Sequence, residues 1–162
     1  MKTLIVYTGK YGFTKQCVED IASALKGAVD VVELNIPTNI DLTNYNQVII
    51  GGAIYMGKVH KNITTFVHNN LEILRNKRIG LFITCGFSEN FDMYLRETYP
   101  ERLLAIALTK RCFGGELQIS KMKFFDKMLT KMMIYMRNKE HASLPHKQTN
   151  QIDLFIKALT IL

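Results

Sequence analysis

Three segments of the sequence combine glycines, hydroxyl groups and aromatic rings in a way that suits ligand binding. The first is "TGKYGFT", residues 8–14, which separates a short apolar run from a helical pattern. Gly9 and Gly12 permit positive φ angles and let a ligand approach the backbone. Thr8 and Thr14 offer hydroxyl groups, and backbone N–H groups at the start of the following helix attract anions. These residues predict a phosphate site, although a plain strand-to-helix turn with Thr14 as its N-cap would explain them equally well.

Two other phosphate-binding patterns are absent from this segment. It does not contain GxxxxGKS or GxxxxGKT, the phosphate loop of nucleoside triphosphatases. It also does not contain GxGxxG, which argues against a dinucleotide. A phosphate monoester is therefore the best match.

The second segment is "GGAIYMGK", residues 51–58, in which glycines surround an apolar and aromatic group. Its glycines predict a mobile backbone around Ile54, Tyr55 and Met56. A flat aromatic ligand could stack there, which stabilises by about 0.5–1.5 kcal/mol per ring contact. The alternative is a hydrophobic loop that packs into the core.

The third segment is "TCGFSENF", residues 84–91, which adds small polar residues and a second ring. Thr84, Gly86 and Ser88 are small, and Phe87 could stack on a ligand. Together, the three segments predict a phosphate cradle and two walls for a planar ring. This combination is more specific than any one segment.

The elements that position these segments alternate along the chain. Apolar runs predict strands at 2–7, 29–35, 47–55, 78–86 and 111–119, and helical periodicity predicts helices at 14–26, 61–75, within 96–108, at 121–138 and at 149–161. This alternation predicts an α/β fold, with a parallel sheet covered by helices on both faces. The three segments follow the first, third and fourth predicted strands. The carboxyl ends of these strands should therefore lie together and form one ligand site. We expect one domain spanning residues 1–162.

Composition narrows the class of protein further. The chain has 162 residues, 48% of them hydrophobic, and a net charge of +7. The start "MKTLIVYTGK" is too short for a signal peptide, and three widely spaced cysteines without CxxC favour a cytoplasmic protein. No pattern indicates a nucleic-acid module or a metal site, so we expect neither partner.

The segment 121–138 predicts a helix with two distinct faces. Phe125, Met128 and Met132 share one face with further apolar residues, and Lys123 and Lys127 begin a row of lysines on another. The simpler interpretation is an amphipathic helix with its apolar side in the core. However, this helix carries more apolar groups than one core face can hide, which suits an anionic membrane surface or a partner helix.

Two longer segments and the first loop carry a resemblance to a known family. These are "GGAIYMGKVHKNITTFV" at 51–67 and "FGGELQISKMKFFDKMLTKMMIYM" at 113–136. With them, essentially the whole chain resembles the flavodoxin family, most closely its menaquinone-dependent protoporphyrinogen dehydrogenase branch, which works in bacterial haem synthesis. The resemblance implies a flavodoxin-like open five-stranded parallel sheet in the order 2-1-3-4-5, and FMN as cofactor.

The resemblance also implies which residues contact FMN. Those expected to hold the phosphate are Thr8, Lys10, Tyr11, Gly12, Phe13 and Thr14, with Lys10 either contributing a charge or pointing into water. Those expected along the ring system are Ala53, Ile54, Tyr55 and Met56 on one side, and Thr84, Cys85, Gly86 and Phe87 on the other. Gly57 would allow a peptide flip on reduction, since glycine changes φ easily.

Two further side chains near the expected site have alternative interpretations. Cys85 could be a redox thiol, but no cysteine lies near it in sequence, so a small loop residue is the simpler interpretation. His60 could donate a proton or contact a substrate, but its place before a helix favours a cap or a solvated side chain.

The implied chemistry belongs to the flavin, so we expect no catalytic side chain. One hypothesis is an enzyme that passes electrons from a reduced substrate, such as a porphyrinogen, to a quinone. The alternative is an electron carrier without a substrate, but carriers commonly use acidic surfaces and this chain is basic. A non-catalytic binding module on the same fold is a third hypothesis. We expect a cytoplasmic protein, peripheral on the membrane if the basic helix binds it, and the sequence leaves the oligomeric state open.

Overall fold

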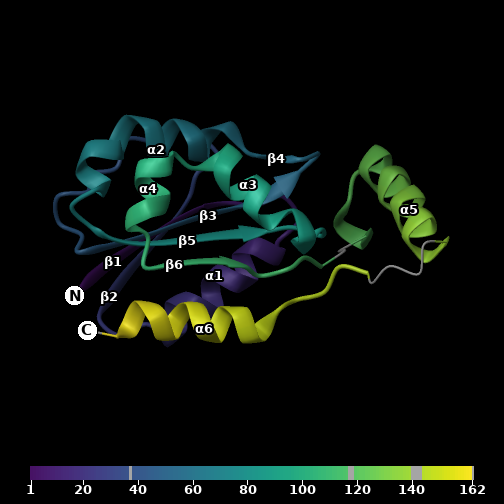
Figure 1. The fold of residues 1–162 in the computed structure, drawn as a ribbon. Helices are drawn as coiled ribbons and strands as arrows, with labels where there is room; N and C mark the ends of the chain where they lie inside the picture. Colours follow the sequence, from purple (N-terminus) through teal and green to yellow (C-terminus); the bar gives the residue numbers. More distant parts are fainter. Residues whose placement is uncertain (37, 117–118, 140–143, 162) are drawn as a thin grey trace.

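Five parallel strands form an open sheet in the order β2-β1-β3-β5-β6. A computed structural model, shown in Figure 1, describes residues 1–36, 38–116, 119–139 and 144–161. The parallel strands are β1 (Lys2–Thr8), β2 (Ala28–Glu33), β3 (Gln47–Tyr55), β5 (Arg78–Thr84) and β6 (Thr109–Cys112). Counted along the chain, these five strands have the predicted order 2-1-3-4-5. The fold prediction is therefore confirmed, with one addition: β4 (Lys58–Val59) pairs antiparallel with β3.

Helices cover both faces of this sheet (Figure 1). On one face lie α1 (Phe13–Ala24) and α6 (Thr149–Thr160), and on the other lie α2 (Lys61–Leu74), α3 (Phe91–Thr98) and α4 (Glu101–Ile106). Successive side chains of a strand point to opposite faces. Leu4 and Val6 of β1 accordingly belong to the core under α2, α3 and α4, whereas Ile5 and Tyr7 belong to the core under α1 and α6.

The glycines at the end of β3 serve packing rather than mobility. A Cβ atom on Gly51 would lie 2.3 Å from the ring of Phe82, which stacks on Phe113 with ring centroids 4.9 Å apart. A Cβ atom on Gly52 would lie 2.7 Å from Val59. Both glycines lie inside β3, so the prediction of a mobile backbone at Gly51 and Gly52 is wrong. Only Gly lets the neighbouring side chains approach this closely.

The predicted boundaries differ from the structure in the second half of the chain. The last strand, predicted at 111–119, ends at Cys112 because Gly114 has a φ of 73° and turns the chain. Residues 117–118 of that prediction lie outside the described ranges, and Ile119–Lys121 form a 3-10 turn. The helix predicted within 96–108 is replaced by α3 and α4, because Pro100 disfavours a helical conformation at the residue before it.

Helix α5 (Phe124–Lys139) lies apart from both faces of the sheet, beyond the carboxyl ends of the strands (Figure 1). None of its residues is buried. Phe125 and Met132, expected in the core, are 72% and 58% exposed. The interpretation of this helix as a core element is therefore wrong. Its residues have the right periodicity, but no sheet face lies under them.

Candidate functional site

The first loop places an uncapped helix start at the end of β1. Gly12 is the N-cap residue of α1, with a φ of 95° and no side-chain hydrogen bond to the first turn. The prediction of Thr14 as N-cap is therefore wrong. Backbone N–H groups in the first turn of a helix have no partner within the helix. They remain available for an anionic ligand group, as the phosphate prediction requires.

Three threonine hydroxyl groups lie at the ends of β1 and β5 and in the first turn of α1. Thr14 Oγ1 lies 2.8 Å from Thr84 Oγ1, and this buried hydrogen bond joins the first loop to the third. Thr8 Oγ1 is buried and has no hydrogen-bond partner within the described part of the chain. A buried polar group without a partner costs about 1–3 kcal/mol. A Cβ atom on Gly52 would lie 2.8 Å from Thr8 Oγ1, so the Thr8 hydroxyl faces β3.

The second loop is a tight hairpin between β3 and β4. Met56 and Gly57 have φ angles of 49° and 81°, and Tyr55 pairs with Lys58. Two successive positive φ angles are typical of the two-residue type I′ turn, whose twist matches that of the flanking strands. The turn leaves Met56 77% exposed at the tip of the hairpin. The aromatic and apolar side chains therefore stand on a short ribbon instead of a mobile loop.

The third loop follows β5 and is held by the segment after β6. Cys85 donates its backbone N–H to the Gly114 carbonyl at 2.8 Å. A Cβ atom on Gly86 would lie 3.0 Å from Pro145, so the chain passes close by on that side. The guanidinium of Arg137 on α5 lies 4.8 Å from the centroid of the Phe87 ring.

A cavity of about 340 Å³ lies between the three loops and α5. Thirteen of the fifteen predicted site residues line it: Lys10, Tyr11, Phe13, Thr14, Ala53, Ile54, Tyr55, Met56, Gly57, Thr84, Cys85, Gly86 and Phe87. Thr8 and Gly12 do not line it, although they belong to the same first loop. The structure thus brings the three loops to one place, as the sequence predicts.

Sequence reasoning missed the far wall of the cavity. The additional lining residues are Tyr94, Gly115, Glu116, Met122, Asp126, Leu129, Thr130, Met133 and Pro145. Most lie on α5 or just before it. One signal was available: Asp126 is the only acidic residue between Lys121 and Lys139, among six basic ones.

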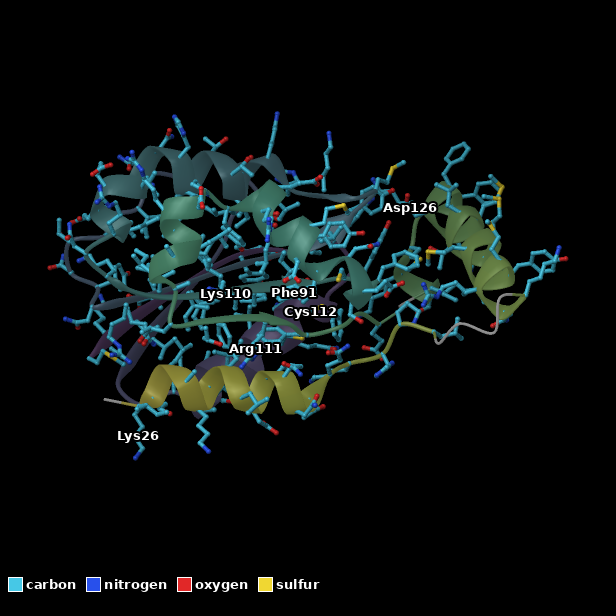
Figure 2. All side chains as sticks on the ribbon, viewed as in Figure 1. Lys26, Phe91, Lys110, Arg111, Cys112 and Asp126 are labelled. Atoms are coloured by element: carbon cyan, nitrogen blue, oxygen red, sulfur yellow. The ribbon has the colours of Figure 1, made fainter. Side chains whose placement is uncertain are left out.

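Asp126 joins the first two loops to α5 at the wall of the cavity. Its carboxylate lies 2.8 Å from Lys10 Nζ and accepts hydrogen bonds from the hydroxyl groups of Tyr11 and Tyr55. Figure 2 shows Asp126 on the side of α5 nearest the rest of the molecule. Lys10 also lies over the Tyr55 ring, 3.3 Å from its centroid, so the alternative that Lys10 points into water is wrong.

These contacts shift the acidity of both charged groups. Hydrogen bonds from Lys10, Tyr11 and Tyr55 hold the pKa of Asp126 well below its ordinary value of 3.8. Partial burial lowers the pKa of Lys10, but hydrogen bonds with Asp126 and Tyr55 outweigh this effect and raise it above 10.5. Both groups are therefore charged near neutral pH, and the wall of the cavity holds a cation and a carboxylate in contact.

Comparison with known proteins places the chain in a family. A sequence model of the flavodoxin domain matches residues 4–143. The chain belongs to the flavodoxin family. No curated protein matches it in sequence.

Solved structures share the fold of this flavodoxin-family chain at low sequence identity. A flavodoxin from Streptococcus pneumoniae TIGR4 is 16% identical with a TM-score of 0.55, covering 98% of this chain and 97% of that one. A flavoprotein from Lactobacillus acidophilus NCFM, crystallised in complex with FMN, is 21% identical with a TM-score of 0.51, covering 68% and 92%. Flavodoxin 1 from Bacillus cereus is 13% identical with a TM-score of 0.50, covering 88% and 100%. These likenesses concern the fold alone.

A second ion pair fastens α5 in this flavodoxin-family structure. Arg137 Nη1 lies 3.1 Å from Glu89 Oε1, and the Arg137 side chain is only 14% exposed. Asp126 lies near the start of α5 and Arg137 near its end. Two charged contacts, to different loops, therefore hold the helix over the cavity.

The segment 88–110 and His60 have mainly structural roles in this flavodoxin-family chain. Only Tyr94 of this segment lines the cavity, whereas Leu95, Tyr99 and Leu103 are buried in the core. His60 Nδ1 accepts a hydrogen bond from the Asn62 backbone N–H at 3.3 Å, which confirms the interpretation of a helix cap.

Two absences concern the described residues only. No group of three His, Cys, Asp or Glu side chains in the described ranges could hold a metal ion. Within the same ranges, no helix is both long and apolar enough to cross a bilayer.

Proposed function

We propose that this protein binds FMN in the cavity and uses it to transfer electrons. The observation that carries the proposal is the meeting of an uncapped helix start with two ring-lined loops around one cavity. The family supports it, and so does the Lactobacillus acidophilus flavoprotein of the same fold, which was crystallised with FMN.

The residues of the site fit this cofactor. The first turn of α1, with Phe13 and Thr14 at the cavity wall, offers donors for a phosphate. Tyr55, Met56 and Phe87 offer apolar and aromatic surface for the ring system. The volume of about 340 Å³ lies in the range of ~300–1,000 Å³ that small-molecule sites have.

When bound, the flavin would supply the redox chemistry itself. The protein would contribute position and environment. Apolar walls from Ile54, Met56 and Phe87 would disfavour negative charge on the reduced ring, because burying a charge in apolar surroundings costs free energy. Helix α5 would limit the access of water, since it forms the outer wall of the cavity.

For the reaction, we propose an enzyme that resembles the menaquinone-dependent protoporphyrinogen dehydrogenases and passes electrons from a reduced substrate to a quinone. The support is the apolar far wall, where Met122, Leu129 and Met133 of the α5 region face the predicted cofactor loops. Such a wall suits an apolar electron acceptor beside the ring.

A flavodoxin-type electron carrier is the second candidate. The cavity volume favours it, because about 340 Å³ suits a single ligand better than a cofactor and a substrate together. A carrier would exchange electrons with a partner protein at the rim of the cavity, where Met56 is exposed.

One pair of measurements tests the proposal. The purified protein should be yellow and should release FMN on denaturation. A colourless protein that takes up no added FMN would exclude both candidates. The FMN-loaded protein should then be supplied with protoporphyrinogen and a menaquinone analogue. Oxidation faster than with heat-inactivated protein supports the enzyme, whereas no acceleration favours the carrier.

We further propose that α5 docks on an anionic membrane surface and gives access to a membrane quinone. Its outer side exposes large apolar side chains, and a row of lysines runs beside them. Apolar groups beside a cationic row complement an anionic lipid surface. The apolar residues are Phe124, Phe125, Met128, Met132, Tyr135 and Met136, and the lysines are Lys123, Lys127 and Lys131.

Charge reversal tests this membrane proposal. Changing Lys123, Lys127 and Lys131 to Glu should weaken binding to liposomes that contain anionic phospholipid, measured by sedimentation. The control carries the same charge change at three exposed lysines outside α5: Lys26, Lys61 and Lys157. If the two triple variants bind liposomes equally well, α5 is not the docking surface.

A further inference from the structure

Two cysteines that are distant in the sequence touch each other at the wall of the cavity. Cys85 directly follows β5, and Cys112 is the last residue of β6, the neighbouring parallel strand. Their sulfur atoms lie 3.4 Å apart. Figure 2 labels Cys112. The expectation that Cys85 has no partner cysteine rested on its distance from the others in the sequence. The pairing of β5 with β6 brings Cys112 next to it.

The backbone on both sides of this pair is fixed by hydrogen bonds. Cys85 N–H donates to the Gly114 carbonyl at 2.8 Å, and Phe113 N–H donates to the Ile83 carbonyl at 3.0 Å. A disulfide bond is about 2.05 Å long, so the sulfurs need to approach by about 1.3 Å. The two residues are offset in register, since Cys112 lies opposite Ile83, so their side chains must rotate toward each other to close this gap.

Only one of the two cysteines lines the cavity. Cys85 lines the cavity, whereas Cys112 does not and lies behind it. Both side chains are almost fully buried, at 4% and 7% exposure. A reactant in the cavity therefore meets Cys85 first, with Cys112 in contact behind it.

The shared hydrogen bond also makes one thiol easier to ionise. The contact with Cys85 lowers the pKa of Cys112, against the effect of burial, because one proton serves both sulfurs. The same contact, together with burial, raises the pKa of Cys85. The thiolate is the reactive form of cysteine, so a thiolate in contact with a thiol is primed for disulfide formation once an oxidant is present.

The third cysteine provides an internal comparison. Cys17 belongs to the core on the opposite face of the sheet, among side chains of α1 and α6. Burial raises the pKa of Cys17 to about 12. It is buried like the other two, but neither its position nor its acidity suits redox chemistry.

We propose that Cys85 and Cys112 form a reversible dithiol–disulfide couple that exchanges two electrons with the flavin of the proposed function. In one direction, the two thiols lose two protons and two electrons and form one sulfur–sulfur bond, and the oxidised flavin accepts the two electrons and two protons. In the other direction, the reduced flavin returns them and the bond breaks. The couple would store one electron pair beside the cofactor. The identity of the electron acceptor rests on the proposed function, whereas the couple itself does not.

The first measurement uses the protein without flavin. It is treated with the thiol oxidant diamide, denatured, alkylated and weighed by mass spectrometry. The wild-type protein has three free cysteines, so it should lose two reactive thiols and 2 Da, with the linked peptides containing Cys85 and Cys112. Cys17→Ser should behave in the same way, and Cys112→Ala should lose none. Three remaining thiols in the oxidised wild type, or a link through Cys17, would overturn the proposal.

The second measurement tests exchange with the flavin. FMN-loaded protein with a preformed disulfide is illuminated without oxygen in the presence of EDTA, which photoreduces flavin and not disulfides. Wild type and Cys17→Ser should gain two thiols in the light and none in the dark, and Cys112→Ala should gain none. No gain in the light would overturn the exchange with flavin. A protein that takes up no FMN would remove the proposed function and the exchange, and the first measurement would still decide whether the couple exists.

Buried substitutions can unfold a protein, so each variant needs a fold check by circular dichroism. If Cys112→Ala does not fold, Cys112→Ser replaces it, because serine has a similar volume and forms no disulfide. Cys17→Ser controls for the loss of a buried thiol, since it removes one without touching the pair.

Discussion

Asp126 places a carboxylate among three side chains that the loops could otherwise offer to a ligand. Lys10, Tyr11 and Tyr55 come from the first two loops, and all three contact this one group. The Asp126 side chain is only 12% exposed. An anionic ligand that uses the same donors must therefore compete with Asp126 for them.

We predict that Asp126→Asn loosens α5. The substitution removes the charge that Lys10 pairs with and keeps the size of the side chain. Backbone amides of α5 should exchange hydrogen several-fold faster than in the wild type, measured by mass spectrometry.

Asp30→Asn is the matched control for this prediction. Asp30 is also held by a lysine and a tyrosine, with Lys2 at 3.0 Å and the Tyr45 hydroxyl at 2.7 Å, but it lies on β2, away from α5. The control should leave exchange in α5 unchanged. Equal exchange in α5 for the two variants would show that Asp126 does not hold the helix.

We predict that the contact opens in acid. The pKa of Asp126 lies below its ordinary value of 3.8, so its contribution to docking is complete above that value and is lost as the pH falls through the lowered one. The pKa of Lys10 is raised, so its charge is lost only above its ordinary value of 10.5. Exchange protection of α5, corrected for the intrinsic effect of pH, should therefore stay level between these limits and fall in acid.

Asp126→Asn also tests whether protonation of Asp126 causes the opening in acid, because asparagine does not titrate. This variant should show no acid step in the protection of α5. A wild-type protein that keeps full protection in acid, with an intact far-UV spectrum, would contradict the pH prediction.

At the scale of single residues, the sequence predicts the near side of the site and not the far side. Glycine and hydroxyl patterns mark a loop that can approach a ligand, whatever the rest of the fold does. The role of Asp126 depends on where α5 lies, and no local pattern encodes that position. The same holds for Cys85 and Cys112, which the register of two strands brings together. Such pairs are visible only when the sheet is known.

At the scale of elements, Gly51 fixes how closely β3 and β5 pack. We predict that Gly51→Ala costs about 1–3 kcal/mol of unfolding free energy, because the added methyl group would overlap the Phe82 ring. Urea unfolding measures this loss. Replacing the ring by the smaller leucine side chain in a Phe82→Leu background should reduce the cost of Gly51→Ala. The two residues are in contact, so their effects on the free energy of unfolding should not add. An equal cost in both backgrounds would mean that the ring is not the obstacle.

The elements themselves differ in how well the sequence predicts them. The long parallel strands are buried on both faces, so unbroken apolar runs such as "TLIVY" reveal them. The strand β4 has two residues and no pattern of its own, and its Met56–Gly57 turn is not one of the frequent hairpin sequences. The periodicity of α5 predicts its helix correctly but cannot say what each side faces, because apolar side chains repeat alike toward a core, a cavity or a membrane.

At the scale of the whole molecule, the proposed cofactor should stabilise the fold by mass action. A ligand at one hundred times its dissociation constant adds about 2.7 kcal/mol. In a chain of 162 residues, this corresponds to a rise in Tm of roughly 5–10 °C. Thermal unfolding with and without FMN measures the shift. Riboflavin lacks the phosphate and should give a smaller one, and no shift with either compound would contradict FMN binding.

Helix α5 touches the cavity with one side and presents the opposite side outward. Suppose that a membrane or partner binds the outer side and prefers one position of the helix. It then changes the affinity of the cavity for its ligand by some factor. Thermodynamic reciprocity requires the ligand to change the affinity for the membrane or partner by the same factor. A tenfold change in affinity on one side of the helix thus implies a tenfold change in affinity on the other, which corresponds to about 1.4 kcal/mol. The sixteen residues of α5 could in this way couple ligand binding in the cavity to binding at the outer surface of the helix.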